Sequence, residues 1–304
     1  MANYYELPTL ANTDLPVGKR VRLHRLLYEH GPANGTLLVL PIDQGLEHGP
    51  MDFFDNPNSK FPLFQYELAK QGNFSAIALQ FGLAAKYLKG YAGEVPLILK
   101  INGKTSVPSD DEAFSPLTAS VEDAVRLGAD AVGYTLYVGS PAQMDDIAQL
   151  QEVRDDCDYY GMPLIVWAYP RGTAVEGKGG RDSFYAIDYA ARVTAEMGAD
   201  IVKVNYPKVN PEKDAKAPKP YRELKVTADE AFKEVVKSAG RTMVLVSGGS
   251  KEGDEALLNK ARLSMEAGAT GLIFGRNLWQ RKMDDALKIA AEIHKIMAKF
   301  PRKP

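Results

Sequence analysis

The sequence predicts an α/β protein that folds as a single (β/α)8 barrel preceded by a helical extension. Three observations support this fold class. Strand-like and helix-like segments alternate along the chain, a short Gly-Ala repeat separates helices from the following strands, and no linker divides the pattern. The 304 residues suit such a barrel with insertions. We expect an N-terminal extension over residues 1–34 and the barrel over residues 35–304.

The extension contains one predicted helix, over residues 19–29, which Gly31 and Pro32 end. Eight strand-like segments rich in β-branched and aliphatic residues follow, with amphipathic segments between them. The predicted strands are residues 35–43, 74–82, 95–102, 130–139, 163–170, 200–207, 241–249 and 270–278. The clearest predicted helices are residues 120–127, 185–197, 228–238, 255–266 and 284–298.

A short repeat marks the return from helix to strand. Leu127–Asp130, Met197–Asp200 and Ala267–Thr270 each have Gly-Ala at their centre, and Gly commonly ends a helix. Strands that alternate with helices form a parallel sheet with right-handed crossovers, and its closed form is the barrel. An open doubly wound sheet is the alternative fold, but no Gly-x-Gly-x-x-Gly sequence follows the first strand.

Composition excludes several classes of function. The 37 basic and 39 acidic side chains give no sign of a nucleic-acid or anionic-membrane partner. No apolar run approaches the ~18 residues of a membrane span, and residues 1–8 lack the pattern of a signal peptide. The one cysteine, Cys157, permits no internal disulfide or cysteine-based zinc cluster. We expect a cytoplasmic protein that binds a small molecule.

Lys203 is informative because it lies in the middle of a β-branched strand. An isolated ammonium group is costly to bury, so it requires a partner, a lowered pKa or a covalent role. Alternate residues of a strand face opposite sides. Val202 and Val204 suit the helix layer, so Lys203 and Asn205 are predicted to point into the barrel.

The same alternation directs other polar and aromatic side chains toward the mouth of the barrel. They are Asp43 from strand one, Lys100 and Asn102 from strand three, and Trp167, Tyr169 and Arg171 from strand five. Barrel interiors are normally aliphatic, so this convergence predicts a functional cavity. A lysine that is desolvated there, or crowded by Lys100 or Arg171, can lose its proton and attack a carbonyl. The structural alternatives are a buried Lys–Asp ion pair and, for Trp167, a simple core aromatic.

The last two strands lead into glycine-rich sequences, Ser247-Gly248-Gly249-Ser250 and Phe274-Gly275-Arg276-Asn277. Ser-Gly-Gly-Ser alone usually forms a turn. However, the loops after strands seven and eight are the common phosphate site of barrel enzymes, where glycine lets backbone N–H groups approach an anion. Arg276 adds positive charge. The predicted substrate is therefore a phosphorylated carbonyl compound.

Four long connections, over residues 45–62, 102–116, 171–182 and 208–225, follow strands and are candidate walls or lids of the cavity. The first begins beside Asp43, Glu47 and His48, which together suggest an alternative metal site. We disfavour a metal, because the other histidines lie in the extension or the last helix. His48 is expected to be a loop residue or a substrate contact.

Five motifs resemble those of the class I fructose-bisphosphate aldolases of the archaeal type, a family also found in bacteria. They are Leu40–His48, Trp167–Arg171, Gly198–Lys203, Ser247–Gly249 and Gly275–Arg276. The resemblance implies a lyase that reversibly cleaves fructose 1,6-bisphosphate through a lysine Schiff base, without a metal or other cofactor. It also implies a homo-oligomer of high order, such as an octamer or decamer.

The resemblance further implies roles for individual residues. Lys203 forms the Schiff base and Tyr169 transfers protons, while Asp43, Trp167 and Arg171 complete the pocket. Gly248, Gly249, Gly275 and Arg276 match the family's phosphate-binding positions. Apart from the resemblance, Ser247 is a further substrate-binding candidate, and Lys100 and His48 are additional candidates. Two other functions share these features: a related Schiff-base aldolase or transaldolase-like synthase acting on another phosphorylated sugar, and a non-catalytic sugar-phosphate sensor. The segments 172–182 and 208–225 are where such enzymes are expected to differ.

Overall fold

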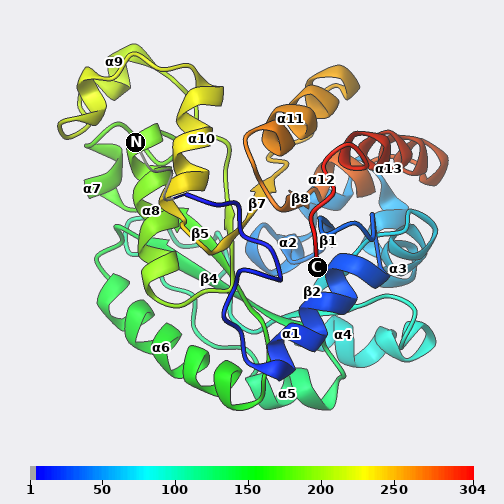
Figure 1. The fold of residues 1–304 in the computed structure, drawn as a ribbon. Coiled ribbons are helices and arrows are strands. Elements are labelled where there is room, and N and C mark those ends of the chain that lie inside the picture. Colours follow the sequence, from blue (N-terminus) through cyan, green and yellow to red (C-terminus); the bar gives the residue numbers. More distant parts are fainter. Residues whose placement is uncertain (1–4) are drawn as a thin grey trace.

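Eight parallel strands form a closed barrel at the centre of the computed structural model, which describes residues 5–304 (Figure 1). Each strand pairs with the next along the chain, and Leu37 of the first lies in register with Gly271 of the last. The predicted (β/α)8 fold is confirmed, and the open-sheet alternative is wrong. The strands are β1 (Leu37–Pro41), β2 (Ala76–Gln80), β3 (Leu97–Lys100), β4 (Ala131–Val138), β5 (Leu164–Pro170), β6 (Ile201–Val204), β7 (Met243–Ser247) and β8 (Gly271–Ile273).

Helices surround the barrel and also occupy several of the connections (Figure 1). The longer ones are α1 (Val17–His24), α3 (Pro62–Gln71), α4 (Phe81–Tyr87), α5 (Val121–Arg126), α6 (Gln143–Tyr159), α8 (Phe184–Glu196), α10 (Ala228–Ser238), α11 (Asp254–Glu266) and α13 (Met283–Met297). Four short ones are α2 (Gln44–Glu47), α7 (Thr173–Glu176), α9 (Pro211–Asp214) and α12 (Arg276–Trp279). The irregular turns are a π-helix, Arg25–Glu29, and the 3-10 helices Gly49–Phe53, Pro57–Lys60, Leu88–Tyr91 and Tyr221–Glu223.

Local sequence explains where several helices begin and end. Ser120 with Asp123, and Thr227 with Glu230, form capping boxes that satisfy the first N–H groups of α5 and α10. The glycines of the Gly-Ala repeat have positive φ angles of 66°, 88° and 99°, which residues with a Cβ atom rarely adopt. The repeat therefore marks helix ends, as predicted.

Strand parity divides the apolar core into two layers. Outward-facing residues such as Leu38, Val166 and Val202 pack with the surrounding helices. Inward-facing residues such as Val39 and Ile165 form a separate cluster inside the barrel. Both layers match the predicted alternation, so a polar residue in an inward position projects along the barrel axis or toward its mouth.

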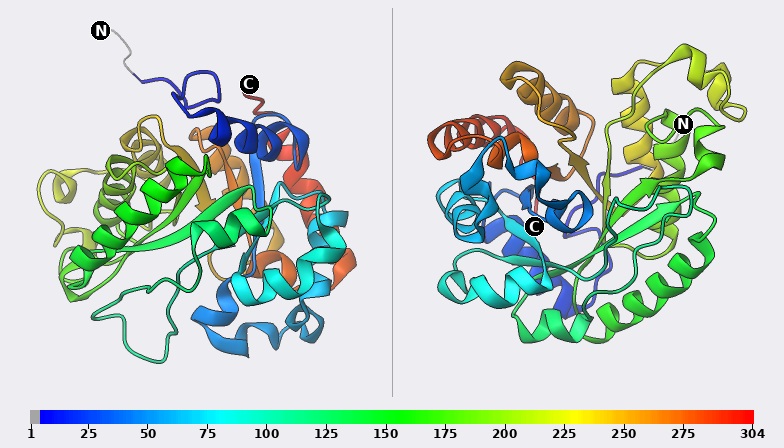
Figure 2. Two further views of the ribbon diagram at one scale, coloured as in Figure 1. Left: turned by 90° about the horizontal axis from the view of Figure 1, so that it is seen from below. Right: turned by 180° about the vertical axis from the view of Figure 1, so that it is seen from behind.

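The N-terminal extension lies across the end of the barrel where the strands begin (Figure 2). Leu10, Leu23, Leu26 and Leu27 are almost completely buried and belong to the inner cluster. The extension therefore closes the bottom of the barrel and shares its core. The boundary at residue 34 stays a prediction. In residues 5–304, no helix is both long enough and apolar enough to cross a membrane.

Three predicted strands run too far. β2 ends at Gln80, where α4 begins, and β6 ends at Val204 rather than at residue 207. β8 ends at Ile273 rather than at residue 278, and Arg276–Trp279 is helix α12. Short apolar runs do not distinguish strand from helix by periodicity. Here Leu278 and Trp279 are buried as helix residues on the barrel.

Candidate active site

A cavity of about 460 Å³ opens at the ends of the strands opposite the N-terminal extension. Most of the predicted site residues line it, from five of the eight strand ends or the loops after them. They are Asp43, His48, Tyr169, Arg171, Lys203, Ser247, Gly248, Gly249, Gly275 and Arg276. The remaining two, Trp167 and Lys100, are outside this lining. Both are almost completely buried, at 1% and 2% exposure.

Lys203 is the central amine of this cavity. Its side chain is inward on β6, the residue is only 4% exposed, and Nζ is hydrogen-bonded to the hydroxyl of Tyr169. Burial lowers its pKa from 10.5 to about 8. The Asp43 and Glu47 carboxylates oppose this shift, whereas the charges of Lys100 and Arg276 add to it. A substantial fraction of Lys203 is therefore uncharged slightly above neutral pH.

Two lysines lie close to the ring of Trp167. The Nζ atoms of Lys203 and Lys100 lie 5.3 and 5.2 Å from the centre of its ring. Gly133 of β4 leaves room for this arrangement, since a Cβ atom there would lie 2.8 Å from the indole and 3.0 Å from Cδ of Lys100. Trp167 thus forms the floor on which Lys203 rests, which is more than ordinary core packing.

Lys100 is held by oxygen atoms of β3 and β4 and their loops. Its Nζ donates to Oγ1 of Thr135 at 2.6 Å and to the carbonyl of Asn102 at 3.2 Å. Burial lowers its pKa, against the opposing charges of Asp43 and Glu47. Because these partners are neutral, the charge of Lys100 still acts on Lys203.

Tyr169 presents its hydroxyl to Lys203. Burial and the Glu47 and Asp43 carboxylates hold its pKa well above its usual value, although the Arg171 guanidinium opposes them from 5.1 Å above the ring. The phenol therefore carries its proton at neutral pH in the free protein. It is placed to give or take a proton next to the Lys203 nitrogen.

Arg171 connects two of the long loops at the cavity mouth. Asp110, in the loop after β3, accepts from Lys104 at 2.8 Å and from Arg171 and Arg181 at 3.2 Å each. These three cations hold the pKa of Asp110 down, against its burial. The segments 102–116 and 171–182 are thus joined through one carboxylate.

Asp43 lies at the mouth above β1 and is 7% exposed. Among residues 5–304 no carboxylate forms an ion pair with Lys203, so the Lys–Asp pair considered from the sequence is absent. The negative charge of Asp43 favours the protonated form of Lys203. Because no carboxylate in this part of the chain is in direct contact with it, however, Lys203 lacks an ion-pair partner that would keep it charged.

His48 is paired with Asp52 rather than with Asp43 or Glu47. Its Nδ1 lies 2.6 Å from Oδ2 of Asp52, and the same oxygen is 3.8 Å from Arg276. In the described part of the chain, no three His, Cys, Asp or Glu side chains gather closely enough to hold a metal ion. The arrangement required by the metal alternative is therefore not formed.

The glycine-rich sequences after β7 and β8 meet at one side of the cavity. The N–H of Gly248 continues the sheet by donating to the carbonyl of Ile273 at 3.2 Å, and the N–H of Gly249 donates to Oγ of Ser247 at 3.3 Å. Arg276 lies at the start of α12 and not in a strand. Its half-buried guanidinium faces the same space.

Sequence reasoning missed several cavity residues. Glu47 was considered only as a metal ligand, although it neighbours Asp43 in the same motif. Arg181 and Lys208 lie in two of the connections predicted as walls, 171–182 and 208–225, but neither residue was predicted as a site residue. Lys260 comes from α11 and bonds to Glu252. No local signal could have found it, since helix α11 reads as an ordinary amphipathic helix.

Residues 37–281 match the DeoC/LacD family aldolases. The match includes all eight strands, and the chain belongs to this family of aldolases. The resemblance to class I fructose-bisphosphate aldolases inferred from the motifs is confirmed by individual relatives. One, named fructose-bisphosphate aldolase class 1, from Thermoproteus tenax, is 40% identical over 265 residues, which are 86% of this chain and 90% of that protein.

Two further proteins define the relationship. A Methanocaldococcus jannaschii protein, named fructose-bisphosphate aldolase/6-deoxy-5-ketofructose 1-phosphate synthase, is 34% identical over 86% of this chain and 81% of its own length. A solved archaeal fructose-1,6-bisphosphate aldolase, with its catalytic Lys covalently bound to the carbinolamine intermediate of the substrate, superimposes with a TM-score of 0.77. It is 36% identical and the match covers 91% of this chain and 99% of that one.

Proposed function

We propose that this protein is a class I fructose-bisphosphate aldolase that cleaves fructose 1,6-bisphosphate reversibly to dihydroxyacetone phosphate and glyceraldehyde 3-phosphate. One observation carries the proposal: a buried lysine with a pKa of about 8, without a carboxylate partner, faces a cavity with clusters of cations at its mouth. The names of the relatives at 34–40% identity agree with it.

In the proposed reaction, uncharged Lys203 adds to the C2 carbonyl of the open-chain sugar, and loss of water from the carbinolamine gives an iminium ion. The iminium accepts the electron pair of the C3–C4 bond when that bond breaks, and glyceraldehyde 3-phosphate leaves. Protonation of the enamine at C3 and hydrolysis then release dihydroxyacetone phosphate and free Lys203. The covalent imine with Lys203 is the electron acceptor of the reaction, and no cofactor takes part.

We assign the proton transfers to Tyr169, whose hydroxyl already contacts the Lys203 nitrogen. The proton of the C4 hydroxyl must be removed as the C3–C4 bond breaks. A phenol with a raised pKa is a poor base in the free protein, but an iminium charge beside it would favour the phenolate. Asp43 either assists dehydration of the carbinolamine or keeps Lys203 in place.

The cavity has two groups of cationic side chains, and each group could bind one of the two phosphates of the substrate. Arg276, with Ser247, Gly248, Gly249 and Gly275, would hold one phosphate beyond β7 and β8. Arg171, with Arg181 and Lys208, would hold the other beyond β5 and β6. Trp167 and Lys100 support Lys203 from below, and His48 is a candidate contact through Nε2, because its Nδ1 is engaged by Asp52.

Borohydride trapping tests the proposal. The protein is incubated with dihydroxyacetone phosphate, reduced, and digested for mass spectrometry, and we expect the adduct on Lys203. Active protein with Lys203 unmodified would sink the proposal. Tyr169→Phe should still give the adduct but lose roughly 10²–10⁴-fold in cleavage rate, the usual range for a general acid–base group. Full cleavage by that variant would remove Tyr169 from its assigned role.

A second candidate substrate class follows from the name of the Methanocaldococcus jannaschii relative, which combines the aldolase with a synthase of another sugar phosphate. Comparing cleavage rates for several ketose phosphates separates the two, since the lysine chemistry is shared. A protein that binds these sugars without any turnover would instead be a sensor.

We also propose that the protein works as a homo-oligomer of high order in the cytoplasm. The resemblance to the archaeal-type aldolases supports the oligomer, and the single cysteine, buried Cys157, is compatible with a reducing compartment. Light scattering of the purified protein measures the oligomeric state directly, and a monomer at working concentration would contradict this proposal.

A further inference from the structure

Asn277 is a completely buried polar residue that the proposed reaction does not use. It follows Arg276 in helix α12, and its side chain points away from the cavity into the loop after β7. Its Nδ2 donates to the carbonyls of Gly248 and Ser250, both at 3.1 Å, and its Oδ1 accepts from the N–H of Glu252 at 2.8 Å. One amide therefore binds three backbone groups within five residues.

The pattern of these three bonds requires an amide. Two backbone carbonyls need a donor with two hydrogens, and one N–H needs an acceptor on the same side chain. An aspartate of equal size would set a carboxylate oxygen against the carbonyls of Gly248 and Ser250, and an alanine would satisfy none of the three groups. The shape of the loop depends on the chemistry of Asn277 and not only on its volume.

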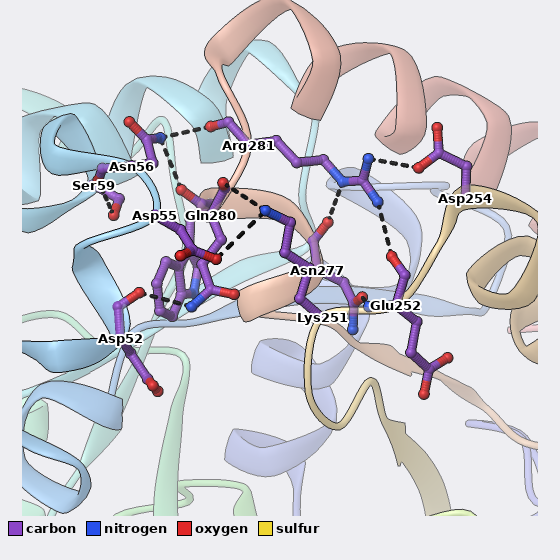
Figure 3. A network of polar contacts seen from close by, with 11 residues as sticks. Asp52, Asp55, Asn56, Ser59, Lys251, Glu252, Asp254, Asn277, Gln280 and Arg281 are labelled. Atoms are coloured by element: carbon purple, nitrogen blue, oxygen red, sulfur yellow. Dashed lines mark hydrogen bonds and ion pairs between the residues drawn. The ribbon is translucent and has the colours of Figure 1, made fainter.

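Neighbouring contacts fix α12 to the same loop (Figure 3). Arg281, just beyond α12, donates to the carbonyl of Asn277 at 2.6 Å and pairs with Asp254 at 2.6 Å. It also reaches the carbonyl of Glu252 at 3.4 Å. Residues 248–254 are thus tied to the helix that carries Arg276, so the loop and the guanidinium have one fixed spacing.

We propose that Asn277 is a positioning residue for phosphate recognition: it holds residues 248–250 at the spacing from Arg276 that a substrate phosphate requires. The inference rests on the proposed function, because it assumes that these residues receive a phosphate. Asn277 is in helix α12 and does not touch the substrate, whereas Lys203 is in strand β6. Its loss should therefore weaken recognition of the phosphate and leave imine formation intact.

The test compares two ketones that differ only in the phosphate. Borohydride trapping on Lys203 is titrated with dihydroxyacetone phosphate and with dihydroxyacetone, in the wild type and in Asn277→Asp. We expect the half-saturating concentration of dihydroxyacetone phosphate to rise at least about tenfold, from the loss of two or more hydrogen bonds in the loop. For dihydroxyacetone it should change by less than about twofold.

Asn56→Asp is a matched control. Asn56 is also buried, and its Nδ2 donates to the carbonyls of Trp279 and Arg281, at 2.9 and 2.5 Å, near the other end of α12 (Figure 3). The Asn56→Asp substitution makes the same chemical change next to the same helix without touching residues 248–252. In this variant, borohydride trapping on Lys203 should have the same half-saturating concentration as in the wild type for both ketones.

Two results with Asn277→Asp would overturn the inference. One is an unchanged half-saturating concentration of dihydroxyacetone phosphate, and the other is an equal rise in the half-saturating concentrations of both ketones. If Asn277→Asp does not fold, Asn277→Ala, which introduces no charge, replaces it. The expected result is the same: the half-saturating concentration rises for dihydroxyacetone phosphate but not for dihydroxyacetone. Absence of any adduct on Lys203 in the wild type is a different outcome, since it contradicts the proposed function before Asn277 is tested.

Discussion

Two buried lysines at opposite ends of the barrel have opposite properties. Lys19, in the N-terminal helix α1, is 2% exposed, and Lys203, at the cavity, is 4% exposed. Lys19 pairs with Asp158 at 2.6 Å and with Asp200 at 2.9 Å. Lys203 instead contacts the hydroxyl of Tyr169 and lies close to the rings of Tyr169 and Trp167.

The pKa values follow from these partners. Burial by itself lowers the pKa of Lys19, but the Asp200 and Asp158 carboxylates more than offset burial and raise it. Burial prevails at Lys203, where the pKa falls to about 8. Burial alone therefore does not make a lysine nucleophilic. What matters is that burial is not accompanied by a close carboxylate.

The largest expected effect comes from Lys203→Met. We expect the cleavage rate to fall by at least about 10³-fold, since the covalent route is lost. The free energy of unfolding should stay the same or rise by about 1–4 kcal/mol, because a buried amine without an ion pair is replaced by an apolar chain. Activity assays and urea unfolding measure the two quantities. If Lys203→Met were strongly destabilised as well as inactive, the contrast between Lys203 and the ion-paired Lys19 would be wrong.

Lys19→Met should show the reverse pattern. It leaves Asp200 buried and unpaired at the base of β6, and breaking such a pair lowers the free energy of unfolding by about 3–5 kcal/mol. The folded fraction of the Lys19→Met variant should still cleave the substrate. Lys237→Met, which removes an exposed pair with Glu234, is the control, and we expect a change below about 1 kcal/mol. Equal stability of the Lys19 and Lys237 variants would refute the role of Lys19.

The two lysines should also impose opposite pH dependence on stability. Between pH 8 and 10.5 the Lys203 amine is uncharged in the folded protein but protonated in the unfolded chain. The unfolded state then binds more protons, so stability gains about 3 kcal/mol from Lys203 as pH rises through this window. Lys19 contributes stability that is lost only as pH rises through its raised pKa. Urea unfolding at several pH values should show the gain in the wild type and its absence in Lys203→Met.

The smallest expected effect concerns Lys100, whose charge lowers the pKa of Lys203. In Lys100→Met, the pH at which the rate of borohydride trapping is half-maximal should move upward from about 8. Thr135→Val removes the 2.6 Å acceptor of Lys100 but keeps its charge, so its midpoint should stay near that of the wild type. A midpoint that moves down in Lys100→Met would show that Lys100 does not act through its charge.

Much of the site could be predicted because strand parity is a local property. Once the strands were placed, alternation directed Lys203, Tyr169 and Asp43 to the mouth, and the structure has all three lining one cavity. Strand ends were less predictable. Residues 276–279 form α12 because Leu278 and Trp279 are buried on the barrel, and a run of four residues does not reveal that packing.

The sequence by itself determined the order of strands and helices, the face on which each strand residue lies, and the chemical types gathered at the mouth. Only the tertiary structure decided which of the buried lysines is paired. Lys19 and Asp200 are far apart in sequence, as are Asn277 and Gly248, and each pair meets only when the barrel closes. A pKa depends on such neighbours through distance in space, so periodicity could identify Lys203 as unusual but could not show that it lacks a carboxylate partner.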